Sequence, residues 1–146
     1  AAEQDYVDAQ YNLGVMYDNG LGVPANDAEA ARWYRKAAEQ GIAVAQSNLG
    51  CMYVTSRGVP HDYAEGVKWN RRAAEQGFAQ AQHNLGVMYA KGHGVPLDYV
   101  EAYKWFLLAA SQRYNPAVNV LYLFTQIMPA AQIAEARRRA SGFGRG

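Results

Sequence analysis

The sequence predicts an all-α fold, an α/α solenoid of antiparallel helix pairs with a period of 36 residues. Two observations carry this prediction. The three tryptophans, Trp33, Trp69 and Trp105, stand 36 residues apart. The same offset relates the Asn-Leu-Gly, Met-Tyr and Gly-Val-Pro segments that begin at positions 12, 16 and 22 to their two later copies. Self-similarity at a fixed period of this length indicates a solenoid, in which each unit packs on its neighbours.

Each unit is predicted to form two helices. The first begins near Ala9 and ends near Asp18, and positions 9, 13, 16 and 17 place small and apolar side chains on one stripe at about 100° per residue. A glycine-containing loop that closes with Pro24 ends it, because proline lacks a backbone donor. The second helix opens on a capping side chain, with Glu at its third position, in all three units: Asn26, Asp62 and Asp98.

The ends of the second helices are predicted from glycine. Gly41 and Gly77 stand where a left-handed C-terminal residue is expected, and Ile42 or Phe78 follows as the accompanying apolar contact. The third unit departs from this pattern, because Arg113 replaces the glycine.

The predicted organisation is one solenoid domain over residues 1–146. Its parts are a remnant of a truncated repeat at 1–8, repeats at 9–44, 45–80 and 81–116, a C-terminal half-repeat with a capping helix at 117–140, and a flexible tail at 141–146. The helix after Ala117 is apolar nearly all round, so we expect it to be buried on several sides. The last helix should run from about Ala130 to Ala140 and cap the array.

The motifs A-Q-x-N-L-G-x-M-Y, G-V-P-x-D and K-W-x-x-x-A-A-E-Q-G resemble the Sel-one-like repeat (SLR) family, within the tetratricopeptide-like (TPR-like) helical-repeat superfamily. The resemblance covers residues 9–116. It implies a right-handed superhelix that serves as a scaffold or adaptor in protein–protein interaction, without an active site shared across the family. Bacterial members of the family are often secreted, periplasmic or host-facing. The expected compartment is therefore periplasmic or secreted if a leader was removed, and cytoplasmic otherwise.

A binding face can be predicted by comparing the repeats with one another. Positions that recur in all units serve packing, whereas one arc of the first helix varies between units. In the TPR-like folds that the chain resembles, this face lines the concave groove, so a protein or peptide segment is the expected ligand. The predicted groove residues are Asp8, Tyr11, Val15, Asp18, Asn19, Val44, Ser47, Cys51, Val54, Thr55, Gln80, His83, Val87, Ala90 and Lys91. The alternative is that this face is merely solvated and free to vary.

Other recurring residues are given structural roles. The repeated Gln10 and Asn12 positions are expected to bond neighbouring backbone or an adjacent repeat. The tryptophans are expected to pack, although a carbohydrate-stacking ladder is the alternative. The basic residues of the second helices follow glutamates at i, i+3 spacing, which predicts a solvated outer face, with a weak patch for an anionic partner as the alternative.

The composition excludes several classes of function. The net charge of +1 gives no support to a nucleic-acid partner, and no apolar run reaches the roughly 18 residues needed for membrane insertion. The single cysteine, Cys51, excludes a multi-thiolate metal site, and the three histidines have no metal-ligand spacing. The Gly-x-Gly loops lack the strand and the Lys-Ser/Thr of phosphate-binding motifs. No metal and no cofactor are therefore expected.

Catalysis is not expected either. Cys51 and His83 lie on corresponding faces of consecutive first helices, but they differ by about one helical turn within the repeat, and no oxyanion donors accompany them. A weak, β-lactamase-like hydrolase of cell-wall compounds and a binder of cell-wall glycans or surface receptors are the alternatives. The hydrolase idea belongs to relatives with paired cysteines in each repeat, which this chain lacks. The leading prediction is a monomeric, non-enzymatic interaction module.

Overall fold

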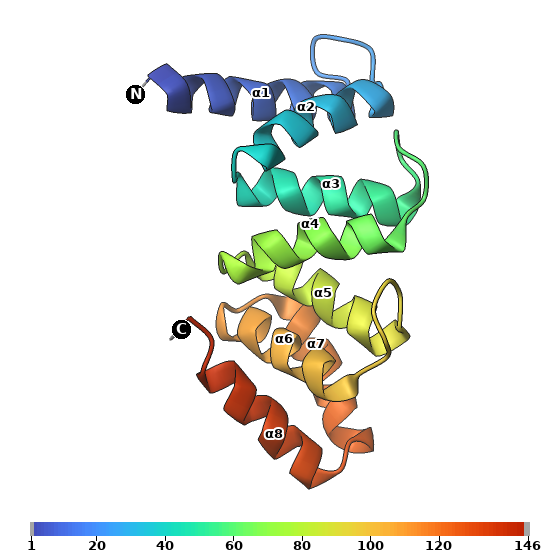
Figure 1. The fold of residues 1–146 in the computed structure, drawn as a ribbon, viewed down its shortest axis with the longest axis vertical. Helices are drawn as coiled ribbons and strands as arrows, with labels where there is room; N and C mark the ends of the chain where they lie inside the picture. The colour runs from blue at the N-terminus through green and yellow to red at the C-terminus, as the bar shows by residue number, and fades with distance from the viewer. Residues whose placement is uncertain (1, 145–146) are drawn as a thin grey trace. The chain divides into compact units, whose positions relative to one another are not determined.

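The computed structural model describes the backbone of residues 2–144 and the side chains of residues 6–144. This part of the chain is built of helices joined by short loops and contains no strand (Figure 1). The helices are α1 (Ala2–Asn19), α2 (Asp27–Glu39), α3 (Ala43–Thr55), α4 (Tyr63–Glu75), α5 (Ala79–Lys91), α6 (Tyr99–Ser111), α7 (Asn115–Ile127) and α8 (Ala130–Ser141).

The chain divides into two compact units, residues 1–73 and residues 74–146. In the first unit α1 packs against α2 and α2 against α3, and in the second unit α5 packs against α6 and α6 against both α7 and α8. Consecutive helices thus pack on one another from α1 to α3 and from α5 to α7, as the period predicts, whereas α8 packs on α6. That the solenoid forms one domain over residues 1–146 stays a prediction.

The predicted caps form as the sequence indicates. The side chains of Asn26, Asp62 and Asp98 accept hydrogen bonds from the backbone N–H groups of the glutamates three residues later, at 3.1, 3.2 and 3.1 Å. Each bond satisfies one of the backbone donors that a helix N-terminus leaves without an intrahelical partner. An asparagine or aspartate side chain therefore caps the start of the second helix of every repeat.

The ends of the second helices show how the third unit manages without glycine. Gly41 and Gly77 have φ of 95° and 94°, in the left-handed region, as predicted. Arg113 holds the equivalent place with φ of 64°. A Cβ atom makes this conformation unfavourable for most residues, so the backbone keeps the turn at a cost in strain.

Glycine also allows the first and second helices of a repeat to approach closely. A Cβ atom on Gly14 would lie 2.6 Å from Cδ1 of Tyr34, and one on Gly86 would lie 2.7 Å from Cε1 of Phe106. Both distances are shorter than real carbon–carbon contacts, so any larger residue would push the two helices apart. The glycine of the Asn-Leu-Gly motif is therefore the point of helix contact.

Each unit has its own apolar core. In residues 1–73 the core joins α1, α2, α3 and α4 through the buried residues Val7, Ala30, Ala31, Tyr34, Ala37, Ala38, Ala45, Leu49, Met52, Tyr53 and Trp69. In the second unit Ala102, Phe106, Ala109 and Ala117 join α6 to α7. A further cluster of Tyr103, Met128 and Ala136 holds α8 against α6.

Helix α8 covers the outer side of α6 (Figure 1). A carboxylate oxygen of Glu101 on α6 lies 2.8 Å from the guanidinium of Arg139 on α8, and the other oxygen lies 3.1 Å from the Lys104 ammonium. Partial burial alone would raise the pKa of Glu101, but the hydrogen bonds from Arg139 and Lys104 outweigh it and lower the pKa. The ion pairs therefore supplement the apolar contact that fixes α8.

The structure differs from the expectations for the two ends of the chain. Helix α1 runs unbroken from Ala2 through the expected remnant at 1–8, because Asp5 stands where later units carry Gly41 and Gly77. Residue 1 lies outside the described residues. At the other end, the ring of Phe143 packs edge-on against Trp105 at 5.7 Å, so residues 141–143 are not a free tail. Residues 145–146 of the expected tail lie outside the described residues.

The expectation for α7 is wrong. Only Ala117 of this helix is buried, whereas Tyr122, Leu123 and Ile127 are each more than 60% exposed. The reason is the course of the chain after Ile127. Helix α8 turns back onto α6, so within residues 74–144 the outer face of α7 is left without a covering helix.

Candidate interaction surface

The predicted groove residues come from the corresponding faces of α1, α3 and α5, and most of them are accessible. Five are exposed: Asp8 within α1, and Asn19, Thr55, Gln80 and Lys91 near helix ends. Nine are half-buried: Tyr11, Val15, Asp18, Val44, Cys51, Val54, His83, Val87 and Ala90. Only Ser47 is fully buried.

The variable positions 11, 47 and 83 have a packing role that sequence reasoning missed. The Tyr11 ring lies 5.9 Å from the ring of Tyr34, and 72 residues later the His83 ring lies 5.3 Å from that of Phe106. The residue at this position changes with the second-helix residue that it contacts, and that residue carries an aromatic ring in the first and third repeats. These positions therefore vary together with their packing partner in the second helix.

The prediction of an accessible face is wrong for Ser47 on α3. Ser47 is 0% exposed, and its hydroxyl lies 3.5 Å from the side-chain oxygen of Asn70. Asn70 occupies the second-helix position that carries an aromatic ring in the other two repeats. A small polar pair thus fills the space that two rings occupy elsewhere. Ser47 is therefore not accessible to a partner.

His83 lies between two rings of the second unit. Its centroid is 5.4 Å from that of Tyr114, in addition to the Phe106 contact, and its buried Nδ1 atom has no hydrogen-bond partner among the described residues. Burial without a compensating acceptor disfavours the charged imidazolium and lowers the pKa of His83. The ring is therefore built into the fold as a neutral aromatic group.

Asp18 takes part in a polar network within the first unit. Its carboxylate accepts a hydrogen bond from the Tyr34 hydroxyl at 2.9 Å and forms an ion pair with Arg57, whose guanidinium also lies 3.3 Å from Asp27. Burial first, and then this carboxylate, raise the pKa of Tyr34. Partial burial would lower the pKa of Arg57, but the two carboxylates raise it. From the sequence, no role was assigned to Arg57. Its charge opposite Asp18 and Asp27 was the missed signal.

Two further groove residues bind their own helix. The Asn19 amide donates to the carbonyl of Val15 at 3.0 Å, and the Thr55 hydroxyl donates to the carbonyl of Cys51 at 2.8 Å. Such bonds shield carbonyls near a helix C-terminus. These two side chains therefore have local structural roles as well as exposed surface.

The repeated glutamines have the structural role that the sequence predicted. Gln82 donates to the backbone carbonyl of Ala74 at 3.2 Å and accepts from the amide of Gln112 at 3.0 Å. In the first unit Gln10 accepts from Gln40, 30 residues later, as Gln82 does from Gln112. The buried glutamines thus tie each first helix to the ends of second helices and are not ligands for a partner.

The tryptophans are packing residues in two of the three repeats. Trp69 and Trp105 are 2% and 3% exposed, whereas Trp33 is half-buried. Basic side chains cover the ring faces, with the Lys36 ammonium 4.5 Å from the Trp33 centroid and the Lys104 ammonium 4.3 Å from that of Trp105. Rings held in this way do not form a ladder for stacking on sugars.

The basic residues of the second helices are paired as their spacing predicts. The ion pairs Glu29–Arg32, Glu65–Lys68 and Glu101–Lys104 have nitrogen–oxygen distances of 3.7, 3.0 and 3.1 Å. Residues 6–144 contain no group of three or more His, Cys, Asp or Glu side chains placed to hold a metal ion. Within the described chain, no helix has both the length and the apolar character needed to cross a membrane.

The comparisons with known proteins agree with this architecture. The family model of the Sel1 repeat matches residues 7–42, 43–78 and 79–114, units of the predicted length that begin two residues earlier than predicted. A search of curated proteins finds no match to the chain. The resemblance and the all-α solenoid class predicted from the sequence are thereby confirmed.

Solved structures from three bacteria share the fold. A Sel1 repeat protein from Oxalobacter formigenes aligns with a TM-score of 0.78 and 43% identity, over 83% of this chain and 50% of that chain. The protein c5321, described as a protective antigen in uropathogenic Escherichia coli strains with an SLR fold, aligns with a TM-score of 0.83 and 43% identity, over 96% of this chain and 31% of that chain. Cysteine rich protein B of Helicobacter pylori has a TM-score of 0.67 at 21% identity, over 82% of this chain and 92% of that chain, and supports the fold alone.

The chain spans about half the length of the first of these proteins and about a third of the second. Sel1 repeats form helical scaffolds that commonly mediate protein–protein interaction and are generally non-catalytic. With three matched repeats in residues 7–114, the chain belongs to the Sel1 repeat family.

Proposed function

We propose that the chain is an adaptor that binds a protein or peptide segment on the accessible faces of its first helices. The observation that carries the proposal is the run of three Sel1 repeats, because repeats of this family typically bind protein partners. The variable faces of α1 and α3 in the first unit, and that of α5 in the second, supply the surfaces, with Ser47 left out because it is buried.

The chemistry of this face suits a polypeptide. On α5, for example, half-buried Val87 and Ala90 lie between the exposed side chains of Gln80 and Lys91. Apolar side chains that are partly exposed gain from being covered, and the polar groups at the helix ends can pair with backbone or charged groups of a partner. A phosphate or nucleic-acid ligand would need a concentration of positive charge, which the overall charge of +1 does not provide.

Peptides selected from a displayed random library against the immobilised chain would test this proposal. Each selected peptide is titrated calorimetrically against the wild type and against a face variant that combines Asp8→Lys, Val54→Glu, Gln80→Glu and Lys91→Glu. All four positions are exposed or half-buried, so the variant should fold. We expect the affinity of the peptides to fall at least about tenfold in the face variant.

The matched control variant makes four exchanges on the second helices, Arg32→Glu, Glu39→Lys, Arg72→Glu and Glu75→Lys, all at exposed positions. It should leave peptide affinity unchanged. The proposal fails if selected peptides bind the face variant as tightly as the wild type, or if the control variant weakens them equally.

A further inference from the structure

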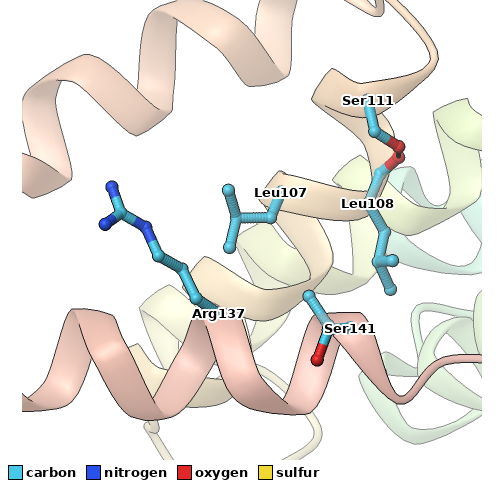
Figure 2. A pocket seen from close by; sticks show the side chains of 6 residues that line it. Leu107, Leu108, Ser111, Arg137 and Ser141 are labelled. Atoms are coloured by element: carbon cyan, nitrogen blue, oxygen red, sulfur yellow. Dashed lines mark hydrogen bonds between the residues drawn. The ribbon is translucent and has the colours of Figure 1, made fainter.

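A pocket of about 470 Å³ lies between α6 and α8, on the opposite helix of the repeat from the proposed binding face. Figure 2 shows its lining, with Leu107, Leu108 and Ser111 contributed by α6 and Arg137 and Ser141 by α8. Its volume is in the range of about 300–1,000 Å³ typical of ligand sites. The pocket is open to solvent and its walls are mainly apolar.

The sequence of the third repeat departs from the first two at this place. Leu107 and Leu108 occupy the positions of Arg35 and Lys36 in the first repeat, and the second repeat has arginine at both. Ser111 likewise replaces a glutamate. Packing under α8 accounts for Leu107, which contacts the cluster that holds this helix. Leu108 and Ser111 are absent from that cluster and line the pocket instead.

Arg137 is the charged residue of the pocket. The neighbouring Arg138 and Arg139 both form ion pairs with Glu135, and Arg139 also reaches Glu101. The guanidinium of Arg137 has no ion pair or hydrogen bond with any side chain or backbone group that the structure describes. Its side chain rises from α8 beside Leu107 (Figure 2). The pocket therefore combines an apolar wall with one positive charge that the fold does not neutralise.

The two serines offer acceptors to a ligand. The Ser111 hydroxyl donates to the carbonyl of Leu108 at 2.6 Å, and the Ser141 hydroxyl donates to that of Arg138 at 2.8 Å. Each proton is thus committed to the protein's own backbone, and the oxygen lone pairs remain to accept. Ligand N–H groups can pair with these oxygens.

We propose that this pocket binds a peptide segment in which large aliphatic side chains stand next to an acidic residue. The aliphatic groups cover Leu107 and Leu108, the carboxylate pairs with Arg137, and backbone N–H groups of the segment donate to the serines. Charge complementarity with Arg137 selects an acidic segment over a basic one. The site lies apart from the first-helix faces and does not rest on the function proposed for them.

A fluorescein-labelled peptide of sequence Leu-Leu-Glu-Leu-Leu-Glu tests the proposal by fluorescence anisotropy on the full chain. Two matched probes replace either Glu by Lys or Leu by Ser. Arg137→Glu reverses the charge of the pocket, and Leu108→Arg restores the residue type of the second repeat at this position. The control variant is Arg138→Glu, on the same helix but outside the pocket lining. Thermal unfolding checks that all three variants fold.

We expect the acidic aliphatic peptide to bind the wild type and the Arg138→Glu variant alike, and to bind each pocket variant at least about tenfold more weakly. Both altered probes should bind weakly. An equal loss of peptide affinity in the Arg137→Glu and Arg138→Glu variants would show that binding depends only on nonspecific charge attraction, and would overturn the proposal. Dodecanoate is added as a competitor to test for a free fatty acid. If dodecanoate displaces the peptide and the three probes bind equally well, the pocket belongs to a fatty acid, and the proposal is overturned as well. Because the first-helix face variant leaves this pocket intact, failure here is distinguishable from failure of the proposed function.

Discussion

The side-chain amide of Gln46 donates a hydrogen bond to the backbone carbonyl of Ala38 at 3.0 Å, and thereby joins the start of α3 to the last turn of α2. Both groups are buried. Gln82 makes the same bond to Ala74, 36 residues later. The bond lies between repeats, because its donor belongs to one repeat and its acceptor to the repeat before it. The Ala38 carbonyl also accepts from the backbone N–H of Gly41 at 3.0 Å, so the glutamine supplies a second donor to a carbonyl at the helix end.

Replacing Gln46 by Leu should therefore destabilise the chain. The substitution keeps the apolar bulk of the side chain but removes this hydrogen bond and leaves the Ala38 carbonyl with only its bond from the Gly41 backbone N–H, which costs about 0.5–1.5 kcal/mol. Urea denaturation followed by circular dichroism measures the loss. The control is Gln126→Leu on an exposed position of α7, which should change stability by less than about 0.5 kcal/mol. Equal effects at the two positions would contradict the role given to the Gln46 bond.

Substitution of Gly86 tests the close approach of the helices. Alanine is intrinsically the better helix former by about 1 kcal/mol, so propensity alone predicts that Gly86→Ala stabilises the chain. The new Cβ atom would instead lie 2.7 Å from the Phe106 ring and force the helices apart, so we expect a net loss of about 1–3 kcal/mol. Gly142→Ala is the control, since a Cβ there would meet nothing closer than 3.6 Å. Stabilisation by Gly86→Ala would show that α5 and α6 are not in contact at this point.

Arg113 offers a prediction of the opposite sign. Its φ of 64° is costly for a residue with a Cβ atom, and the two equivalent positions carry glycine. Arg113→Gly should therefore raise stability by up to about 1 kcal/mol, and the reverse exchange Gly41→Arg should lower it by a similar amount. Differential scanning calorimetry of both variants checks the signs. A lower melting temperature for Arg113→Gly would mean that the arginine side chain contributes more than its strained backbone costs.

His83 predicts a dependence of stability on pH. Burial lowers its pKa in the folded chain below the ordinary value of about 6.5, so the unfolded chain binds a proton at a higher pH than the folded chain does. The contribution of His83 to the free energy of unfolding should be constant above about pH 6.5. It should fall as the pH drops from about 6.5 through the lower pKa of the folded chain. His83→Tyr, which copies the pairing of Tyr11 with Tyr34 in the first repeat, should remove this component.

The measurement for this prediction is the free energy of unfolding between pH 5 and pH 7.5 in both proteins. The Gln126→Leu variant serves as the reference, because it changes no titratable group and should leave the slope unchanged. An identical pH dependence for the wild type and the His83→Tyr variant would show that the histidine is not held neutral by the fold.

Much of the fold could be predicted because it depends on local signals repeated three times. The N-caps at Asn26, Asp62 and Asp98 act over three residues, and Gly41 ends its helix through its own backbone. The buried role of the glutamines followed from their recurrence. In each case the determining interaction recurs in at least two repeats, so one sequence contains its own comparison.

The sequence was less informative where a position depends on a partner far along the chain. Ser47 stands where the first repeat has Tyr11, and the residue 23 positions later changes with it. In the sequence alone, such paired variation looks the same as the free variation of a binding surface. The exposure of Ile127 depends on α8 turning back onto α6, which is set by contacts such as Met128 with Ala136. Periodicity predicts which side chains share a face, but not which face another helix will cover.

Hydrogen exchange of the chain, with and without a selected peptide, reports where on the helices a partner binds. We expect bound peptide to slow amide exchange in α1, α3 and α5, and to leave the exposed outer turns of α2 and α4 unchanged. Slowed exchange confined to the second helices, with α1, α3 and α5 exchanging as in the free chain, would contradict the assignment of the first-helix faces as the binding surface.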